Sequence, residues 1–294
     1  MLEILKGVSK MLDLRCCDNL ELMKEMGDDS IDLIYSDILF GTGRKFKDYQ
    51  DLKPIRSVIE EHYIPRIKEM HRILKDTGSI YLQMDWRISH WIRCIMDDIF
   101  GYENFKNEII WCYRSAGFSK NKWSSKHGNI LFYSKSKEYT FNLDDIRENE
   151  IAKSTQKRFG KEIEELGYIP NLKNGIVYKV NPYSPPRDWF ILNTLPQAHS
   201  ERLGYDTQKP KALVERIIKA SSNEGDLVAD FYAGSHTTGE VALELGRHYI
   251  GCDINPKSLE IGNKRLQEIE NEIVEEKSNL KGASKCILPQ IEKI

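Results

Sequence analysis

The sequence predicts an α/β protein built on a mixed, mostly parallel sheet. Residues 1–113 and 201–294 both alternate short apolar runs with helical patterns, and strands separated by helices typically form parallel sheets. Residues 114–200 are less regular, which indicates an insertion of mixed structure. A chain of 294 residues is long enough to bury one large core and to carry such an insertion.

Two strands and two helices are predicted in residues 1–113. The apolar run Ile31–Ser36 predicts a strand that ends at the polar residue Asp37. Apolar residues recur at helical spacing over Ile59–Leu74, and Ser79–Met84 follows as a second strand. The pattern over Trp86–Phe100 predicts a helix that stops at a glycine.

Residues 201–294 repeat this alternation. We predict helices over Lys211–Ser221 and Gly239–Leu245, strands over Leu227–Asp230 and Tyr249–Asp253, and a charged helix over Leu259–Glu276. A strand followed by a tight turn and a helix start, as in residues 226–239, places that turn where open α/β sheets bind ligands.

The glycines of this turn favour one kind of nucleotide. A dinucleotide site needs GxGxxG so that the backbone closes around a pyrophosphate, but here only Gly234 and Gly239 are present and His236 stands between them. Asp253 ends the next strand about 20 residues after Asp230, which suits the binding of ribose hydroxyls. A ligand with ribose and adenine but no phosphate, such as S-adenosylmethionine, fits this looser turn. The alternative is a turn with a merely structural glycine.

Asp37 is the candidate for chemistry on a planar amine. It ends an apolar strand and precedes Ile38, Leu39 and Phe40, with a Gly-Thr-Gly loop beyond them. Its carboxylate and the Ile38 carbonyl can accept hydrogen bonds from an amine while Phe40 stacks on the ring. Taken alone, Asp37 is better explained as a turn or helix-capping residue than as a catalyst.

Charge is balanced overall but uneven along the chain. The net charge is −2, yet residues 106–137 hold seven Lys or Arg and one acid, interleaved with aromatic residues including Trp111, Phe132 and Tyr133. Basic groups neutralise phosphates and aromatic faces stack on unpaired bases, so this segment predicts nucleic-acid binding. The alternative is a solvated basic face above ordinary buried aromatic residues.

The bulk composition is that of a soluble protein. Hydrophobic residues make up 40% and charged residues 30% of the chain, which excludes gross disorder. No apolar run reaches the roughly 20 residues of a membrane span, and the start of the chain lacks a secretory signal. Six cysteines without a CxxC pair predict reduced thiols. We therefore expect a cytoplasmic protein with no membrane association.

Taken together, these motifs resemble the beta group of DNA amino-methyltransferases. Residues 35–49 resemble that family's DPPF/DPPY segment and its trailing loop, and residues 69–82 resemble the helix and strand that follow. Residues 205–210 are similar to the TQKP element, residues 230–238 to DPFAGSGTT, and residues 247–256 to the ribose-binding strand. The motifs occur over nearly the whole chain in the family's order.

The resemblance implies a Rossmann-like methyltransferase fold and its activity. Residues 1–113 would be the catalytic half, residues 114–200 an inserted target-recognition region, and residues 201–294 the cofactor half. The expected reaction transfers a methyl group from S-adenosylmethionine to the N6 amine of adenine in duplex DNA. Because that amine is out of reach inside a duplex, the base must be flipped out.

The resemblance also implies a set of site residues and implies no metal. The catalytic residues would be Asp37, Ile38 and Phe40. The cofactor would be bound by Asp18, Asp37, Thr207, Lys209, Asp230, Tyr232, Ala233, Gly234, Ser235, Thr237 and Asp253. The DNA would be contacted by Arg44, Lys45, Arg114, Lys120, Lys122, Trp123 and Lys126.

Four residues depart from the family pattern. Ile38 and Leu39 replace the two prolines of the catalytic motif, which removes the rigid backbone that aims the carbonyl. In the cofactor turn Phe231 replaces a proline and His236 a glycine. We expect His236 to need an unusual backbone angle and to narrow the pocket.

Two alternative functions stay open at this point. The same fold can act on the N4 amine of cytosine, although such enzymes usually carry Ser at the position of Asp37. A catalytically silent DNA-binding protein could also retain these motifs. Besides duplex DNA, the resemblance suggests a cognate restriction endonuclease and a second copy of the chain as candidate partners.

Overall fold

A computed structural model describes residues 12–46, 49–148, 150–173, 176–196, 198–205, 207–267 and 269. Within these ranges, no helix is both long and apolar enough to cross a membrane. The predicted helix over residues 259–276 is present as far as the description extends, because residues 256–267 are helical; its last part lies outside the described residues.

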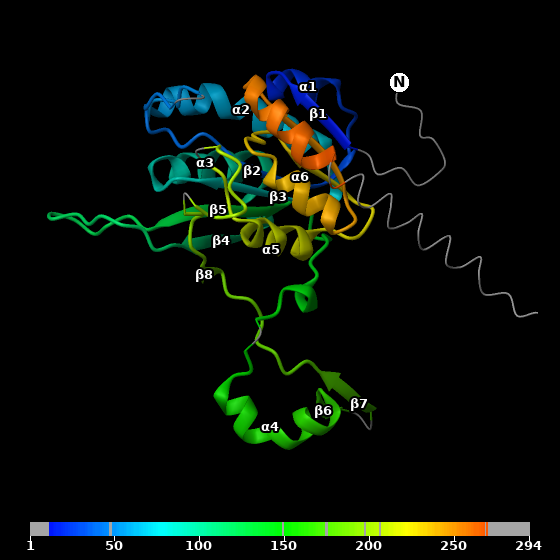
Figure 1. The fold of residues 1–294 in the computed structure, drawn as a ribbon. Helices are drawn as coiled ribbons and strands as arrows, with labels where there is room; N and C mark the ends of the chain where they lie inside the picture. The colour runs from blue at the N-terminus through cyan, green and yellow to red at the C-terminus, as the bar shows by residue number, and fades with distance from the viewer. Residues whose placement is uncertain are drawn as a thin grey trace, which may run out of the picture.

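An eight-stranded sheet forms the centre of the protein (Figure 1). Its strand order is β1-β10-β9-β2-β3-β5-β4-β8. The β3–β5 and β4–β5 pairs are antiparallel and the other five pairs are parallel, which confirms the predicted mixed, mostly parallel sheet. The strands are β1 Leu12–Cys16, β2 Ile31–Asp37, β3 Leu74–Met84, β4 Phe105–Cys112, β5 His127–Ser134, β8 Trp189–Ile191, β9 Leu227–Asp230 and β10 His248–Asp253.

Helices cover both faces of this sheet (Figure 1). One face packs Ile34 and its neighbours against α1, α2 and α3, while the other packs Leu33 and Tyr35 against α5, α6 and residues 256–267. Adjacent residues of β2 thus enter opposite cores, as expected of a strand buried on both faces. The helices are α1 Asn19–Glu25, α2 Arg56–Ile73, α3 Trp86–Phe100, α5 Lys211–Ser221 and α6 Thr237–Glu244, with short 3₁₀ turns at Tyr102–Asn104 and Leu143–Ile146.

The predicted elements of the two outer thirds are confirmed, with shifts at their ends. The strand expected over residues 79–84 begins earlier, at Leu74, immediately after α2 ends. The helix expected over residues 239–245 begins at Thr237. Strand β1, helix α1 and strand β4 have no counterpart among the predictions.

The segment predicted as an insertion is divided between the sheet and a separate small lobe. Strand β5 lies inside the main sheet between β3 and β4, and β8 pairs with β4. Trp111, Phe132 and Tyr133 are therefore buried in the core, so the expectation that they stack on bases is wrong. The lobe consists of α4 Lys153–Leu166 and a hairpin of β6 Ile169–Lys173 and β7 Ile176–Val180. Figure 1 shows this lobe apart from the sheet and joined to it by two connecting segments.

Candidate active site

The main cavity opens where the sheet changes its winding direction. From β2 the chain proceeds to its neighbour β3, and from β9 to its neighbour β10 on the opposite side. Because β2 and β9 are adjacent and parallel, the segments that follow them diverge at the carboxyl edge. Open α/β sheets bind ligands at such a switch point. A cavity of about 320 Å³ lies there, within the usual range for small-molecule sites.

All the residues predicted to bind a cofactor line this one cavity. They come from five separate segments: the start of α1, the end of β2, the stretch before α5, the end of β9 with the turn after it, and the end of β10. The set is Asp18, Asp37, Thr207, Lys209, Asp230, Tyr232, Ala233, Gly234, Ser235, Thr237 and Asp253. Ile38 and Phe40 also line it.

Asp37 lines this cavity, and one of its two carboxylate oxygens has no hydrogen-bond partner among the described residues. Lys209 Nζ donates a hydrogen bond to Oδ2 and also to the Thr207 carbonyl, at 3.0 Å. Asp37 Oδ1 is buried and has no hydrogen-bond partner among the described residues. Burial raises the pKa of Asp37 and the Lys209 ammonium opposes that rise. A buried acceptor without a donor is costly, and this one is suited to an N–H group from a ligand.

Other contacts replace the rigidity of the two missing prolines. The Ile38 N–H donates to the Gln83 carbonyl at 3.0 Å, a bond that a proline could not make. The Ile38 side chain is only 2% exposed and belongs to the core. The Tyr63 hydroxyl donates to the Leu39 carbonyl at 2.9 Å. The backbone after Asp37 is therefore held by a strand partner, a buried side chain and a helix residue.

Asp51 organises the loop that follows Phe40. This carboxylate is only 3% exposed. It accepts the backbone N–H groups of Gly41 and Thr42 at 3.1 and 2.7 Å, as well as the Thr42 hydroxyl at 2.5 Å. The sequence prediction missed this residue because nothing in the sequence pairs it with a loop about ten positions earlier.

Lys209 Nζ is 5.4 Å from the centre of the Phe40 ring.

Asp230 holds the cofactor turn together. Its carboxylate accepts the Tyr232 N–H at 3.1 Å and the Thr238 hydroxyl at 2.6 Å, which joins the two ends of the turn. Burial raises the pKa of Asp230 to about 7. Phe231, which stands where the family pattern has proline, is buried and donates its N–H to the Ser36 hydroxyl at 3.0 Å.

Gly234 and Asp253 bring this turn against β10. Gly234 has φ of +50°, and an added Cβ would lie 3.1 Å from the Tyr205 ring, so both backbone and space favour glycine. The Gly234 N–H donates to Asp253 Oδ2 at 2.9 Å. The other oxygen of this carboxylate, Asp253 Oδ1, accepts the Asn255 N–H at 2.9 Å. Burial raises the pKa of Asp253.

The opposite end of the cavity contains two residues of α2, Arg66 and His62, that the sequence prediction missed. Asp18 caps α1 by accepting the Leu20 N–H at 2.8 Å, and its two oxygens both accept from one guanidinium nitrogen, Arg66 Nη2, at 2.7 and 2.9 Å. Arg66 and His62 both line the cavity from α2. His62 contacts the Tyr232 hydroxyl at 3.1 Å, and burial lowers its pKa to about 4. No local motif marks these residues, since their roles depend on the packing of α2.

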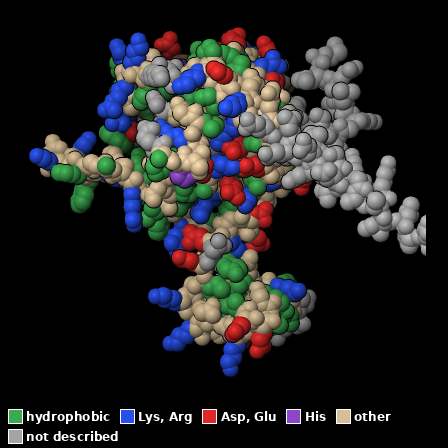
Figure 2. Space-filling model, in the orientation of Figure 1, with side chains coloured by type: hydrophobic (Ala, Val, Ile, Leu, Met, Phe, Trp, Pro, Cys, Tyr) green, Lys and Arg blue, Asp and Glu red, His purple; other side chains and the backbone are tan. Residues whose placement is uncertain are grey.

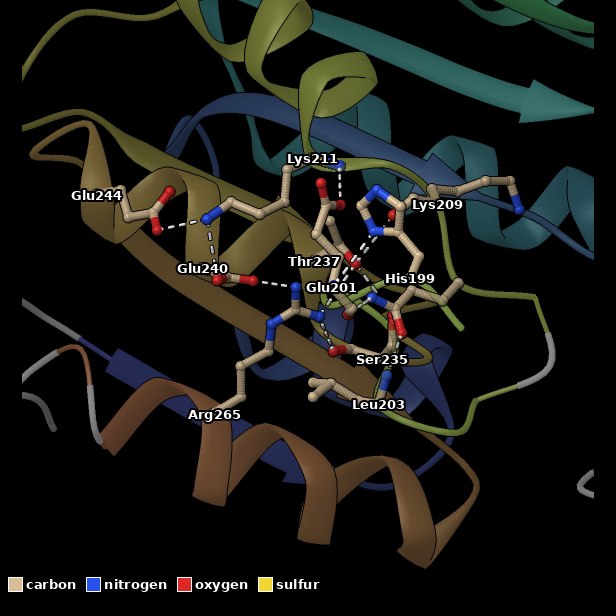
Figure 3. A network of polar contacts seen from close by, with 11 residues as sticks. His199, Glu201, Leu203, Lys209, Lys211, Ser235, Thr237, Glu240, Glu244 and Arg265 are labelled. Atoms are coloured by element: carbon tan, nitrogen blue, oxygen red, sulfur yellow. Dashed lines mark hydrogen bonds and ion pairs between the residues drawn. The ribbon is translucent and has the colours of Figure 1, made fainter. Parts of the chain in front are cut away.

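The cofactor turn is also tied to its surroundings by a polar network (Figure 3). Arg265 donates to the Ser235 carbonyl at 2.9 Å and to the Thr237 hydroxyl at 3.2 Å, and it pairs with Glu240. Lys211 bridges Glu240 and Glu244 at 3.0 and 2.5 Å. The network joins α5, α6 and residues 256–267 behind the turn.

His236 does not narrow the cavity, contrary to the expectation from the sequence. It does adopt the unusual backbone angle, with φ of 54°. Its side chain is 1% exposed, and the described lining of the cavity includes Ser235 and Thr237 but not His236. The left-handed backbone turns this side chain into the protein rather than toward the ligand space.

The predicted DNA contacts lie in two exposed segments. Arg44 and Lys45 belong to the loop after Phe40. Residues 113–126 form the β4–β5 arm, which projects from the protein (Figure 1) and carries basic and hydrophobic side chains (Figure 2). Phe118 and Trp123 on this arm are 82% and 96% exposed.

The arm begins at the carboxyl end of β4, at the same edge of the sheet as the cavity. Lys122 Nζ is 5.9 Å from the ring centre of Trp86, which follows the carboxyl end of β3. Lys126 has an internal role, because its ammonium donates to Ser115 and to the carbonyls of Ala116 and Gly117 at 2.7–3.1 Å. Arg114, Lys120 and Lys122 are exposed.

The fold and the cavity define an α/β protein with a cavity at the switch point of its sheet and a buried carboxylate in the lining. The sequence pattern of the family described as DNA methylase matches residues 31–264. The chain also resembles the DNA adenine methyltransferase YhdJ of Escherichia coli, with 33% identity over 270 residues that cover 90% of this chain and 85% of the relative. This chain therefore belongs to the DNA methylase family.

Solved structures show the same fold at lower sequence identity. The PvuII cytosine-N4-specific DNA methyltransferase superimposes with a TM-score of 0.63 and 16% identity, covering 92% of this chain and 94% of the other. The M1.HpyAVI complex with S-adenosylmethionine gives a TM-score of 0.52 and 18% identity, covering 87% and 100%.

Proposed function

We propose that this chain transfers a methyl group from S-adenosylmethionine to the N6 amine of adenine in duplex DNA. The observation that supports this most strongly is that Asp37 lines the same cavity as Asp230, Gly234 and Asp253, and that its buried Oδ1 has no partner within the described part of the chain. A methyl acceptor and its donor must meet in one space, and this cavity offers groups for both. The name of the Escherichia coli relative, a DNA adenine methyltransferase, agrees with this substrate.

The residues of this chain position the amine. Asp37 Oδ1 and the Ile38 carbonyl accept its two hydrogens, which leaves the nitrogen lone pair directed at the methyl group, and Phe40 stacks on the base. S-adenosylmethionine, when bound, supplies an electrophilic methyl group on a sulfonium. Asp37 Oδ1 would accept the proton that the nitrogen loses when it gains the methyl group. The raised pKa of Asp37 suits it to take that proton.

The proposal also assigns cofactor roles to residues that line the cavity. Asp253 ends β10 with free acceptor capacity for the ribose hydroxyls, beside the turn that it anchors. Tyr232, Ala233, Ser235 and Thr237, which line the cavity, would contact the methionine portion, and Asp18, paired with Arg66, would contact the adenine, as the family resemblance implies. Thr207 and Lys209 close the side next to Asp37.

Aspartate at position 37 favours adenine over cytosine. Enzymes of this fold that methylate cytosine N4 usually carry serine there, and serine is a weaker acceptor with no charge to stabilise the amine as it becomes positive. The likeness to the PvuII enzyme concerns the fold, at 16% identity. A cognate restriction endonuclease and a homodimer stay predictions.

A labelled-methyl assay tests the proposed activity. The protein is incubated with S-adenosylmethionine labelled on its methyl group and with duplex DNA of diverse sequence, and label retained on the DNA is counted. We expect label in DNA that contains adenine. Tight DNA binding without transfer would instead favour a silent DNA-binding protein.

Replacing Lys209 should shift the pH dependence of transfer. Asp37 must be ionised to polarise the amine, so the rate falls as pH drops through its pKa, and Lys209 keeps that pKa lower than burial alone would set it. Lys209→Met therefore moves the acid limb of the pH–rate profile to higher pH and slows transfer at neutral pH. Asp230 and Tyr35, the other titratable groups facing Asp37, remain. Rates at saturating cofactor measure this, with Lys209→Arg as the control that keeps the charge.

Removing charge from the β4–β5 arm should weaken DNA binding and its salt dependence. The segment 113–126 contains no acid, and each phosphate contact contributes about 0.9 to the slope of log K against log salt. Lys120→Ala combined with Lys122→Ala is expected to reduce this slope by up to roughly 2. The matched control is Lys24→Ala, an exposed lysine of α1 paired with Glu21. If the slope does not change, these lysines of the arm do not contact DNA phosphates.

A further inference from the structure

We propose that His236 is a positioning residue that fastens the cofactor turn to β10 and to the 256–267 helix. In this proposal Gly262 is glycine because the His236 ring occupies the space that a side chain there would fill. The inference rests on the proposed function, because it concerns the turn that binds the cofactor. It assigns a role to a histidine that stands where the family pattern has glycine.

The imidazole bridges two elements behind the turn. Its Nδ1 is 3.2 Å from the Tyr249 hydroxyl of β10, and its Nε2 is 3.2 Å from the Ser258 hydroxyl. Burial lowers the pKa of His236 to about 4, so the ring is neutral near pH 7 and has one donor and one acceptor nitrogen. A hydroxyl can serve either nitrogen because it donates and accepts. Both ring nitrogens are thus satisfied inside the core.

Gly262 makes the space that this ring occupies. A Cβ added at Gly262 would lie 2.5 Å from His236 Cδ2 and 2.8 Å from Nε2. Gly262 lies within the helical residues 256–267 and has no positive φ, so its backbone does not need glycine. Glycine inside a helix lowers the stability of that helix. Room for the imidazole is the physical reason for a glycine here.

Each residue of the pair is unfavourable without the other. A side chain in the left-handed region is strained relative to glycine, and His236 at φ 54° and ψ 32° is in that region. Its contacts with Tyr249 and Ser258 offset this strain. The ring contact thus accounts for both the strained backbone of His236 and the glycine inside the helix.

The contact fixes the geometry of the cofactor site. Tyr249 and Asp253 lie on the same strand, so His236 and Gly234 join the turn to β10 at two points. Between them lies Ser235, and Thr237 follows; both line the cavity. A turn held at two points presents these groups in one arrangement before the cofactor arrives, which lowers the ordering cost of binding.

A double-mutant cycle on the full chain tests the pairing. Calorimetry measures the Kd for S-adenosylmethionine in Gly262→Ala, His236→Gly and the double variant. We expect Gly262→Ala to weaken binding about tenfold, because the new methyl group displaces the ring. His236→Gly should weaken it several-fold. The double variant should bind better than Gly262→Ala alone, since the methyl group fills the space that the ring has left.

Two further readouts separate positioning from simple stability. The rate at saturating cofactor should change less than twofold in His236→Gly, and His236→Asn, which tolerates the left-handed backbone and keeps a donor and an acceptor, should retain most of the affinity. Additive effects in the cycle would overturn the pairing, and so would a lower melting temperature with unchanged Kd. A wild-type chain that does not bind S-adenosylmethionine would overturn the proposed function, and this inference with it. Loss of transfer alone, with binding intact, would contradict only the proposed function.

Discussion

Replacing Asp37 with alanine is expected to lower the rate of methyl transfer by roughly 10³-fold, the size typical of losing a positioned acceptor or base. The reason is the geometry at the end of β2, where Oδ1 is buried and unpartnered among the described residues while Lys209 holds Oδ2. Without the carboxylate, the amine keeps only the Ile38 carbonyl as an acceptor, and the Lys209 ammonium faces the cationic donor uncompensated. Single-turnover transfer to duplex DNA measures the rate.

Two controls separate chemistry from structure in that experiment. Asp37→Asn keeps the shape and one acceptor but cannot take a proton, so it should fall between wild type and Asp37→Ala. Calorimetry with S-adenosylmethionine and thermal unfolding check that the site survives. If Asp37→Ala loses both cofactor binding and its folded state, Asp37 is a structural residue.

Replacing Asp253 with alanine is expected to weaken cofactor binding by roughly 100-fold, or about 3 kcal/mol. The carboxylate has two functions, since it would accept the ribose hydroxyls and it already accepts the Gly234 and Asn255 N–H groups at 2.9 Å. Alanine removes both, and the turn loses one of its attachments to β10. Calorimetric titration with S-adenosylmethionine gives the Kd.

Asp253→Asn is the matched control for this change. Its amide oxygen can still accept a hydrogen bond from one backbone N–H, but its NH₂ group cannot accept one from a ribose hydroxyl. We therefore expect a Kd between those of the wild type and Asp253→Ala. The affinity of the protein for DNA in the absence of cofactor should stay the same, because Asp253 lies in the cavity and not on the β4–β5 arm. An unchanged Kd for Asp253→Ala would exclude it as a ribose ligand.

The sequence predicted those parts of the site that local motifs encode. Two local patterns were enough to predict these parts. One is a strand that ends at Asp37, and the other is the strand and turn from Asp230 to Thr238. Parallel pairing then brings these tips to one edge of the sheet, and one cavity contains them. The fold class followed from the same alternation of strands and helices.

Long-range contacts could not be predicted in this way. The pairing of Arg66 with Asp18 and that of His236 with Gly262 depend on how helices pack, and nothing local indicates them. Strand β5 was missed because its aromatic residues resemble a nucleic-acid surface in sequence, and only its place between β3 and β4 shows that they are core. Exposed and buried aromatic residues look alike until the sheet is known.

The most direct test of this account identifies the methylated base. The chain is expressed in cells that lack their own DNA methyltransferases, and the nucleosides of the digested genomic DNA are separated by liquid chromatography and identified by mass spectrometry. N6-methyladenine in cells that express the wild-type chain, and its absence with Asp37→Ala, is the expected result. N4-methylcytosine without N6-methyladenine would contradict the account.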